Sequence, residues 1–123
     1  MNIILDTHIF LWLAADVQKV SKKHMHYIED MGNRLYLSSI SIAEIMIKQS
    51  IGNLDFDADI LMVLDEMGID VLTFDASSAL YLGSLPFHHR DPFDRMIISQ
   101  AITGKYKVIS VDRKFALYDC DLL

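Results

Sequence analysis

The sequence predicts a single α/β domain, in which a central, mainly parallel sheet of four to five strands lies between layers of helices. Short apolar segments typical of buried strands alternate with longer segments whose apolar residues recur at helical spacing. The connections are short, so successive strands are expected to be joined through helices and to lie parallel. A chain of 123 residues, 52% of them apolar, suits one such domain with a well-buried core. We therefore expect one domain over residues 1–123.

Strands are expected where apolar runs end at polar or turn-forming residues: 2–5, 34–38, 70–74 and 107–111, with 121–123 as an edge strand. Helices are expected at 7–15, 21–31, 41–51, from 57 or 59 to 67, 76–82 and 92–103, with a helical turn at 113–117. Glycines at 32, 52, 68 and 104 mark four of the helix ends, a common place for glycine. Residues 83–92 form the one long loop.

Charge and cysteine content limit the function classes. The net charge of −6 argues against a protein that binds nucleic acid through a basic patch. Cys120 is the only cysteine, so an intramolecular disulfide and a thiolate zinc site are excluded. No apolar run reaches the roughly 18 residues of a membrane span, and the N-terminal residues lack the pattern of a signal peptide. We expect a cytoplasmic protein that does not associate with membranes.

Four acidic residues lie where predicted elements meet: Asp6, Glu44, Asp94 and Asp112. Each has a simple explanation as a helix cap, because caps are where Asp and Glu commonly occur. Asp6 and Asp112 each precede a helical segment, and Ser41 with Glu44 has the spacing of a capping box. Asp94 lies in the first turn of its predicted helix, where the helix dipole favours a carboxylate.

Together the four acids suggest a metal site. Asp6 and Asp112 end strands of a parallel sheet, whose carboxyl ends form one edge where ligands bind. Glu44 and Asp94 lie in helices that can begin at that edge. Converging carboxylates repel each other unless a hard divalent cation neutralises them, and Mg²⁺ and Mn²⁺ prefer oxygen ligands. Such a cation would let an acidic protein hold a phosphodiester, activate water and stabilise the transition state.

Histidine is not expected to contribute a metal site. His24 and His26 are two residues apart on a predicted helix and face different sides. His88 and His89 are adjacent in the long loop, with no third ligand at a suggestive spacing.

Four blocks of sequence, in order, resemble the VapC-like toxins of the PIN-domain family. The first is Leu-Asp-Thr-His at 5–8 followed by Leu-Trp-Leu at 11–13, and the second is Ser-Ile-Ala-Glu-Ile at 41–45 with Lys48 and residues 51–54. The third is His-Arg-Asp-Pro-Phe-Asp-Arg at 89–95 with residues 98–101, and the fourth is Val-Ile-Ser-Val-Asp at 108–112 with Phe115 and Tyr118. Ala43 departs from the pattern, because similar sequences often carry a bulky aromatic there.

The resemblance implies a PIN-like three-layer α/β/α fold and a metal-dependent endoribonuclease. It assigns Asp6, Glu44, Asp94 and Asp112 as the catalytic and metal-binding quartet, with Mg²⁺ or Mn²⁺ as cofactor and RNA as substrate. It also implies a homodimer that is neutralised by a cognate antitoxin protein.

Two hydroxyl residues could support the quartet. Thr7 follows the first carboxylate and could bind metal-bound water or a phosphate oxygen, although a Thr at a helix start is nearly as common. Ser110 lies two residues before Asp112, on the same face of the predicted strand.

Three charged residues are further candidates for support. Arg95 could hold a substrate phosphate or orient a carboxylate through a bidentate pair. Lys48 lies one helical turn after Glu44, where a surface ion pair and a phosphate contact are both plausible. Asp91 precedes Pro92, so a helix cap is favoured over an indirect role at the metal site.

Three other functions are compatible with these observations. A receiver-like signalling module also gathers carboxylates and Mg²⁺ at a strand edge, but Glu44 would then be superfluous. A catalytically silent PIN scaffold would act only through protein contacts. A nuclease with a DNA target is separated from one with an RNA target by the resemblance alone.

Overall fold

The computed structural model describes residues 1–123, and it contains a wholly parallel sheet of five strands in the order β3-β2-β1-β4-β5. The strands are β1 (Asn2–Leu5), β2 (Arg34–Ser38), β3 (Ile69–Leu72), β4 (Lys107–Ile109) and β5 (Asp121–Leu122). The helices are α1 (Thr7–Ala15), α2 (Lys22–Glu29), α3 (Ser39–Ser50), α4 (Ile60–Met67), α5 (Ala76–Tyr81) and α6 (Pro92–Gly104). Short 3₁₀ segments cover Val17–Lys19 and Arg113–Leu117. The predicted α/β class and parallel sheet are confirmed.

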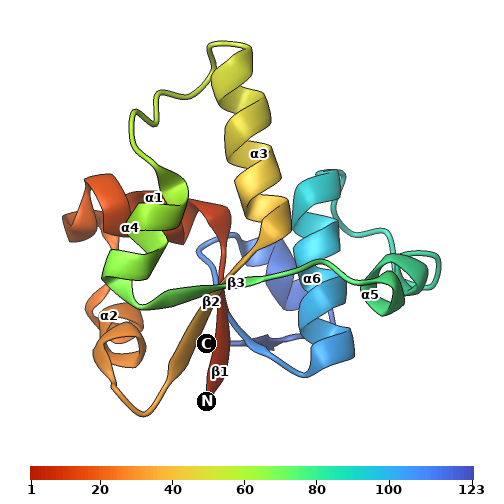
Figure 1. The fold of residues 1–123 in the computed structure, drawn as a ribbon. Coiled ribbons are helices and arrows are strands. Elements are labelled where there is room, and N and C mark those ends of the chain that lie inside the picture. The colour runs from red at the N-terminus through yellow and green to blue at the C-terminus, as the bar shows by residue number, and fades with distance from the viewer.

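Two apolar cores, one on each face of the sheet, make the fold three-layered. Side chains alternate along β1, so that Ile3 and Leu5 belong to one core and Ile4 to the other. Helices α1, α2 and α4 cover the first face, and α5 and α6 cover the second (Figure 1). Helix α3 extends beyond the sheet between the two sets, with Ile45 in the first core and Ile40 packed against the second.

The order of the strands creates a switch point between β1 and β4. From β1 the chain adds β2 and β3 on one side of the sheet, and it then adds β4 and β5 on the other. Ligands of open parallel sheets bind beyond the carboxyl ends of the strands at such a point. The Asp6 N–H donates to the Ile109 carbonyl at 2.9 Å, so the pairing of β1 with β4 persists to that edge.

The boundaries of several elements differ from the prediction. Helix α3 begins at Ser39 rather than residue 41, because the Ser38 hydroxyl accepts the Ile40 N–H at 3.1 Å and caps the helix. Strands β3 and β4 end two residues earlier than expected. Lys105, with φ 57°, ends α6 in the left-handed conformation. None of the helices combines the length and apolarity needed to cross a bilayer.

Candidate metal-binding active site

Asp6 presents a buried carboxylate directly beyond β1. It occupies the position before α1, but its side chain makes no capping hydrogen bond. The Ser110 hydroxyl donates to Asp6 Oδ2 at 2.7 Å, whereas Oδ1 is buried without any partner. A buried acceptor without a partner is rare in proteins, and a water molecule or a cation would satisfy it. The capping interpretation of Asp6 is therefore wrong, and one of its oxygens is available to a cation.

Asp112 lies beyond β4 and uses its two oxygens differently. Oδ1 accepts the Lys114 N–H at 2.9 Å, which confirms the predicted cap of the segment after it. Oδ2 accepts a hydrogen bond from His89 Nε2 at 2.9 Å. The Asp112 N–H donates to Ser110 Oγ at 3.0 Å, so Ser110 connects Asp112 to Asp6. Ser110 thus lies among the acids, as the sequence suggested.

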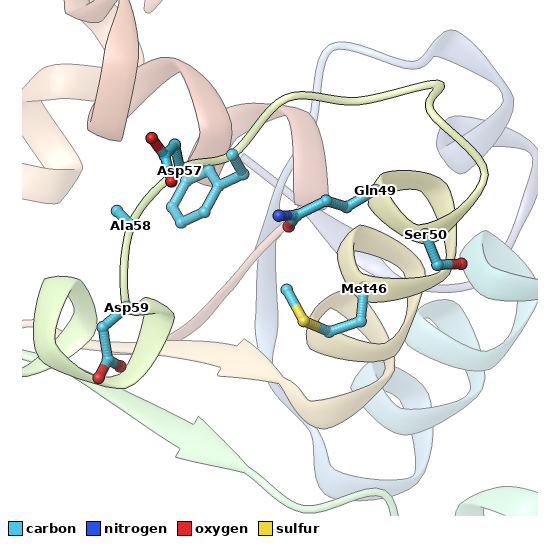
Figure 2. A pocket seen from close by; sticks show the side chains of 7 residues that line it. Met46, Gln49, Ser50, Asp57, Ala58 and Asp59 are labelled. Atoms are coloured by element: carbon cyan, nitrogen blue, oxygen red, sulfur yellow. The ribbon is translucent and has the colours of Figure 1, made fainter.

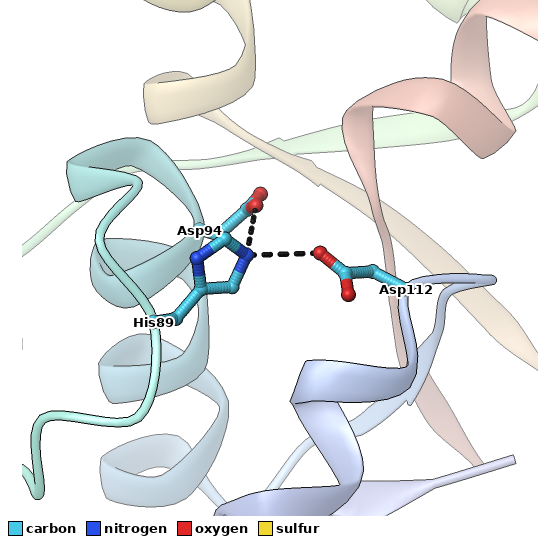
Figure 3. A group of neighbouring side chains, drawn as sticks. All are labelled: His89, Asp94 and Asp112. Atoms are coloured by element: carbon cyan, nitrogen blue, oxygen red, sulfur yellow. Dashed lines mark hydrogen bonds and ion pairs between the residues drawn. The ribbon is translucent and has the colours of Figure 1, made fainter.

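His89 and Asp94 complete this side of the site. His89 Nε2 lies 2.9 Å from Asp94 Oδ2 as well as from Asp112 Oδ2, and the imidazole points between the two carboxylates (Figure 3). His89, Asp94 and Asp112 each offer one potential metal-ligand atom, and these three atoms lie within 4.8 Å of one another. Sequence reasoning missed His89, because ligand spacing along the chain is no guide within an irregular loop. The one available signal was its place at the start of the block at 89–95.

Glu44 lies in the second turn of α3, so the predicted capping box with Ser41 is wrong. Its carboxylate is nearly fully buried, and Oε1 accepts the Thr7 hydroxyl at 2.9 Å while Oε2 pairs with Lys48. The Thr7 hydroxyl also lies 2.8 Å from Ser41 Oγ. Thr7 and Lys48 therefore hold Glu44 in place.

The pKa values indicate that the neighbouring acids act most strongly on Asp94. Burial is the main cause that raises the pKa of Asp6. Burial and then the charges of Asp6, Asp91, Glu44 and Asp112 raise the pKa of Asp94 to about 8. Burial also acts to raise the pKa of Asp112, but hydrogen bonds from the Lys114 N–H and from His89 outweigh it and lower the value. The pKa values of Asp94 and Asp112, whose carboxylates both lie next to His89, are therefore shifted in opposite directions.

Asp91 and Arg95 lie at the beginning of α6, but their side chains form no hydrogen bond or ion pair with the carboxylates of the other acids. Asp91 Oδ1 accepts the N–H groups of Phe93 and Asp94 at 2.9 and 3.4 Å, as expected for a cap followed by proline. The Arg95 guanidinium donates to the carbonyls of Leu85 and Pro86, so the predicted carboxylate pair is wrong for Arg95. Its role in the structure is to anchor the loop before α6.

The residues present fit a divalent cation. Ligand atoms of Asp94, Asp112 and His89 lie within 4.8 Å of one another, and Ser110 connects Asp112 to Asp6, one of whose buried oxygens has no partner. Glu44 on α3 is close enough for its charge to raise the pKa of Asp94. Hard cations such as Mg²⁺ and Mn²⁺ select this kind of oxygen donor set. Asp6, Glu44, Asp94 and Asp112 are the residues that could hold such an ion.

Three solved structures share this fold at low sequence identity. A chain of VapBC2 from Rickettsia felis, bound to a DNA fragment from their promoter, aligns with a TM-score of 0.76 and 18% identity over 100% of this chain and 98% of that one. VapBC-1 from nontypeable Haemophilus influenzae aligns with a TM-score of 0.73 and 20% identity, over 100% of this chain and 97% of that one. VapBC-5 from Mycobacterium tuberculosis, a member of the VapBC family of toxin-antitoxin systems, aligns with a TM-score of 0.62 and 21% identity, over 99% of this chain and 95% of that one.

Comparison by sequence identifies the family. No curated protein matches the chain. The model of the PIN domain matches residues 3–119, a span that contains all four acids and both cores of the fold. The chain therefore belongs to the PIN domain family.

Proposed function

We propose that the protein is a metal-dependent endoribonuclease and the toxin of a toxin–antitoxin pair. The observation that carries the proposal is the grouping of Asp94 and Asp112 at the switch point, joined through Ser110 to Asp6, whose Oδ1 is buried and unpaired. Membership of the PIN domain family and the four sequence blocks support the same function.

Each residue of the site would have a defined task. A bound Mg²⁺ or Mn²⁺ supplies the Lewis acidity that activates the attacking water and stabilises charge on the scissile phosphate. Ser110 orients Asp6, and Thr7 with Lys48 orients Glu44.

Asp94 would make metal binding depend on pH. Its raised pKa means that a proton occupies this carboxyl near neutral pH in the absence of the cation. Asp94 would have to release that proton to hold a cation, because ligands bind in their deprotonated form. The net charge of −6 would then be no obstacle to RNA, because a cation held by the acids would supply positive charge at the site.

The antitoxin partner would bind at an exposed hollow on the α3 and α4 side of the molecule. A hollow of about 610 Å³ lies between the end of α3 and the segment before α4, lined by Met46, Phe56, Asp57 and Asp59 among others (Figure 2). Further apolar side chains are exposed nearby on the same helices: Ile47, Leu61 and Met62. An acidic rim around apolar residues suits a basic amphipathic segment. We further propose a homodimer that acts in the cytoplasm.

Cleavage assays test the proposed activity. The protein, free of antitoxin, is incubated with an unstructured RNA and a DNA of the same sequence, with Mn²⁺ or with EDTA, beside the Asp94→Asn and Asp6→Asn variants. Asp119→Asn is the matched control, because Asp119 is an exposed aspartate outside the site. We expect RNA cleavage that requires the metal and is lost in both site variants only.

Other outcomes of these assays would favour one of the alternative functions. Cleavage of DNA but not RNA would change the substrate class. Full metal-dependent cleavage by both site variants would refute the assigned quartet. Absence of cleavage across several RNAs, together with absence of Mn²⁺ binding in calorimetry, would favour the silent scaffold.

A further inference from the structure

His89 is held in place by a loop that is itself fixed at several points. The loop connects α5 to α6, and Leu85 within it is buried in the second core. The His88 N–H donates to the Tyr118 hydroxyl at 3.0 Å. Arg95 donates to the Pro86 carbonyl at 2.9 Å and to the Leu85 carbonyl at 3.4 Å. The imidazole of His89 is 9% exposed, and the fixed path of this loop determines its position.

The hydrogen bonds of the ring define its protonation pattern. The Asp91 N–H donates to His89 Nδ1 at 3.2 Å. A backbone N–H can only donate, so Nδ1 must accept and carries no proton. In the neutral ring the proton then lies on Nε2, the atom 2.9 Å from both Asp94 Oδ2 and Asp112 Oδ2.

This pattern is opposite to that of a metal ligand. A coordinating histidine offers the lone pair of one nitrogen to the metal and donates the N–H of the other to a neighbouring acceptor. Here the nitrogen remote from the carboxylates faces a donor, so it has no acceptor for a proton. Nε2 can therefore donate its one proton to Asp112 Oδ2, beside Asp94 Oδ2, but it has no free lone pair to offer to a metal ion.

We propose that His89 is a positioning residue: its Nε2–H, which is hydrogen-bonded to Asp112 Oδ2 and lies 2.9 Å from Asp94 Oδ2, keeps these two carboxylates side by side without coordinating the cation itself. The inference rests on the proposed metal site. Asp94 is on α6 and Asp112 follows β4, and His89 is the side chain that connects them (Figure 3). Groups that orient metal ligands in this way typically contribute about 10–100-fold to metal affinity.

Two substitutions of His89 distinguish the effect of losing the N–H donor from the effect of losing the imidazole ring. His89→Gln places an amide N–H₂ at a similar reach, so it keeps a donor for both carboxylates. His89→Leu keeps an apolar side chain of comparable size without a donor. His88→Leu is the matched control, because His88 is the exposed neighbour and its side chain contacts neither carboxylate.

Mn²⁺ affinity, measured by titration calorimetry on the full chain, gives a readout that does not depend on cleavage. We expect His89→Leu to weaken Mn²⁺ binding about 10–100-fold, and His89→Gln and His88→Leu to bind close to wild type. Thermal unfolding in EDTA shows whether each variant folds. Pulsed electron paramagnetic resonance of the Mn²⁺ complex should detect no directly bound imidazole nitrogen in the wild type.

Several results would overturn the proposal. Coupling from a bound ¹⁴N that disappears in His89→Gln would make His89 a ligand. Unchanged Mn²⁺ affinity in His89→Leu, or equal losses in His89→Leu and His89→Gln, would remove the positioning role. If His89→Leu does not fold, His89→Gln and the resonance spectrum still decide. If the protein cleaves no RNA but binds Mn²⁺ in a way that depends on His89, the proposed ribonuclease fails while this inference stands. A wild type that binds no Mn²⁺ would refute the metal site and this inference together.

Discussion

Replacing Asp94 with asparagine should stabilise the cation-free protein while it abolishes metal binding. In the folded protein the pKa of Asp94 is raised from 3.8 to about 8, mainly by burial and then by the neighbouring acids. At pH 7 the folded state therefore keeps a proton that the unfolded chain releases. At about 1.4 kcal/mol per pH unit, this difference costs at most about 4 kcal/mol of stability. The side chain is 15% exposed, and solvent screening reduces our expectation to about 2 kcal/mol.

The sign of the pH dependence follows from which state binds the proton. Below pH 4 the carboxyl is protonated in both states, so Asp94→Asn should have no advantage. Between pH 4 and pH 8 the folded wild type holds a proton that the unfolded state lacks, so its stability falls relative to the variant as the pH rises. Above pH 8 the difference should level off.

Urea denaturation in EDTA, followed by circular dichroism from pH 4 to pH 9, measures this difference directly. Adding Mn²⁺ at about 100 times its Kd should then raise the stability of the wild type by about 2.7 kcal/mol and leave the variant unchanged. Asp119→Asn serves as the control for loss of one negative charge at an exposed position. A stability difference that does not vary with pH in EDTA, or a variant less stable than wild type at pH 7.5, would refute the reasoning.

Three further substitutions test the contacts around the acids. Ser110→Ala leaves Asp6 Oδ2 buried without its donor, so unfolding in EDTA should become easier by about 2 kcal/mol; a loss near zero would mean that this hydrogen bond contributes nothing. Thr7→Val keeps the shape of the side chain but removes the hydroxyl that donates to Glu44. It should lower kcat about tenfold, equivalent to about 1.4 kcal/mol, with little change in KM; an effect on KM alone would contradict a role through Glu44. Tyr118→Phe removes the hydroxyl that anchors the loop before α6 and should destabilise the protein by about 1 kcal/mol in chemical denaturation. It should also weaken Mn²⁺ binding less than His89→Leu does, and a larger loss would argue against the direct contact of His89 as the main effect.

Local sequence patterns were sufficient for the sheet and for the acids that follow its strands. Apolar runs predicted β1 and β2 at their observed bounds, because a strand buried on both faces needs continuous apolar side chains. The parallel topology then placed Asp6 and Asp112 at one edge, since the carboxyl ends of parallel strands coincide. Asp91 and Pro92 predicted the beginning of α6 for an equally local reason, the capping of its first N–H groups.

Contacts between distant residues decided the rest of the site. Arg95 was expected at the acids, yet the carbonyls of the preceding loop and the face of Phe87 take up its guanidinium. Glu44 has the spacing of a capping residue, but Ser38 begins the helix earlier and turns Glu44 inward to Thr7.

The sequence by itself determined the α/β class, the order of the elements and the places of Asp6, Asp94 and Asp112 at strand and helix ends, because periodicity, helix ends and strand ends are local properties of the chain. Only the tertiary structure decided that His89 lies between Asp94 and Asp112 and that one oxygen of Asp6 has no partner. The physical reason is that an irregular loop has no periodicity. Its path is set by hydrogen bonds to Tyr118 and Arg95, and the satisfaction of a buried polar atom depends on every segment that packs around it.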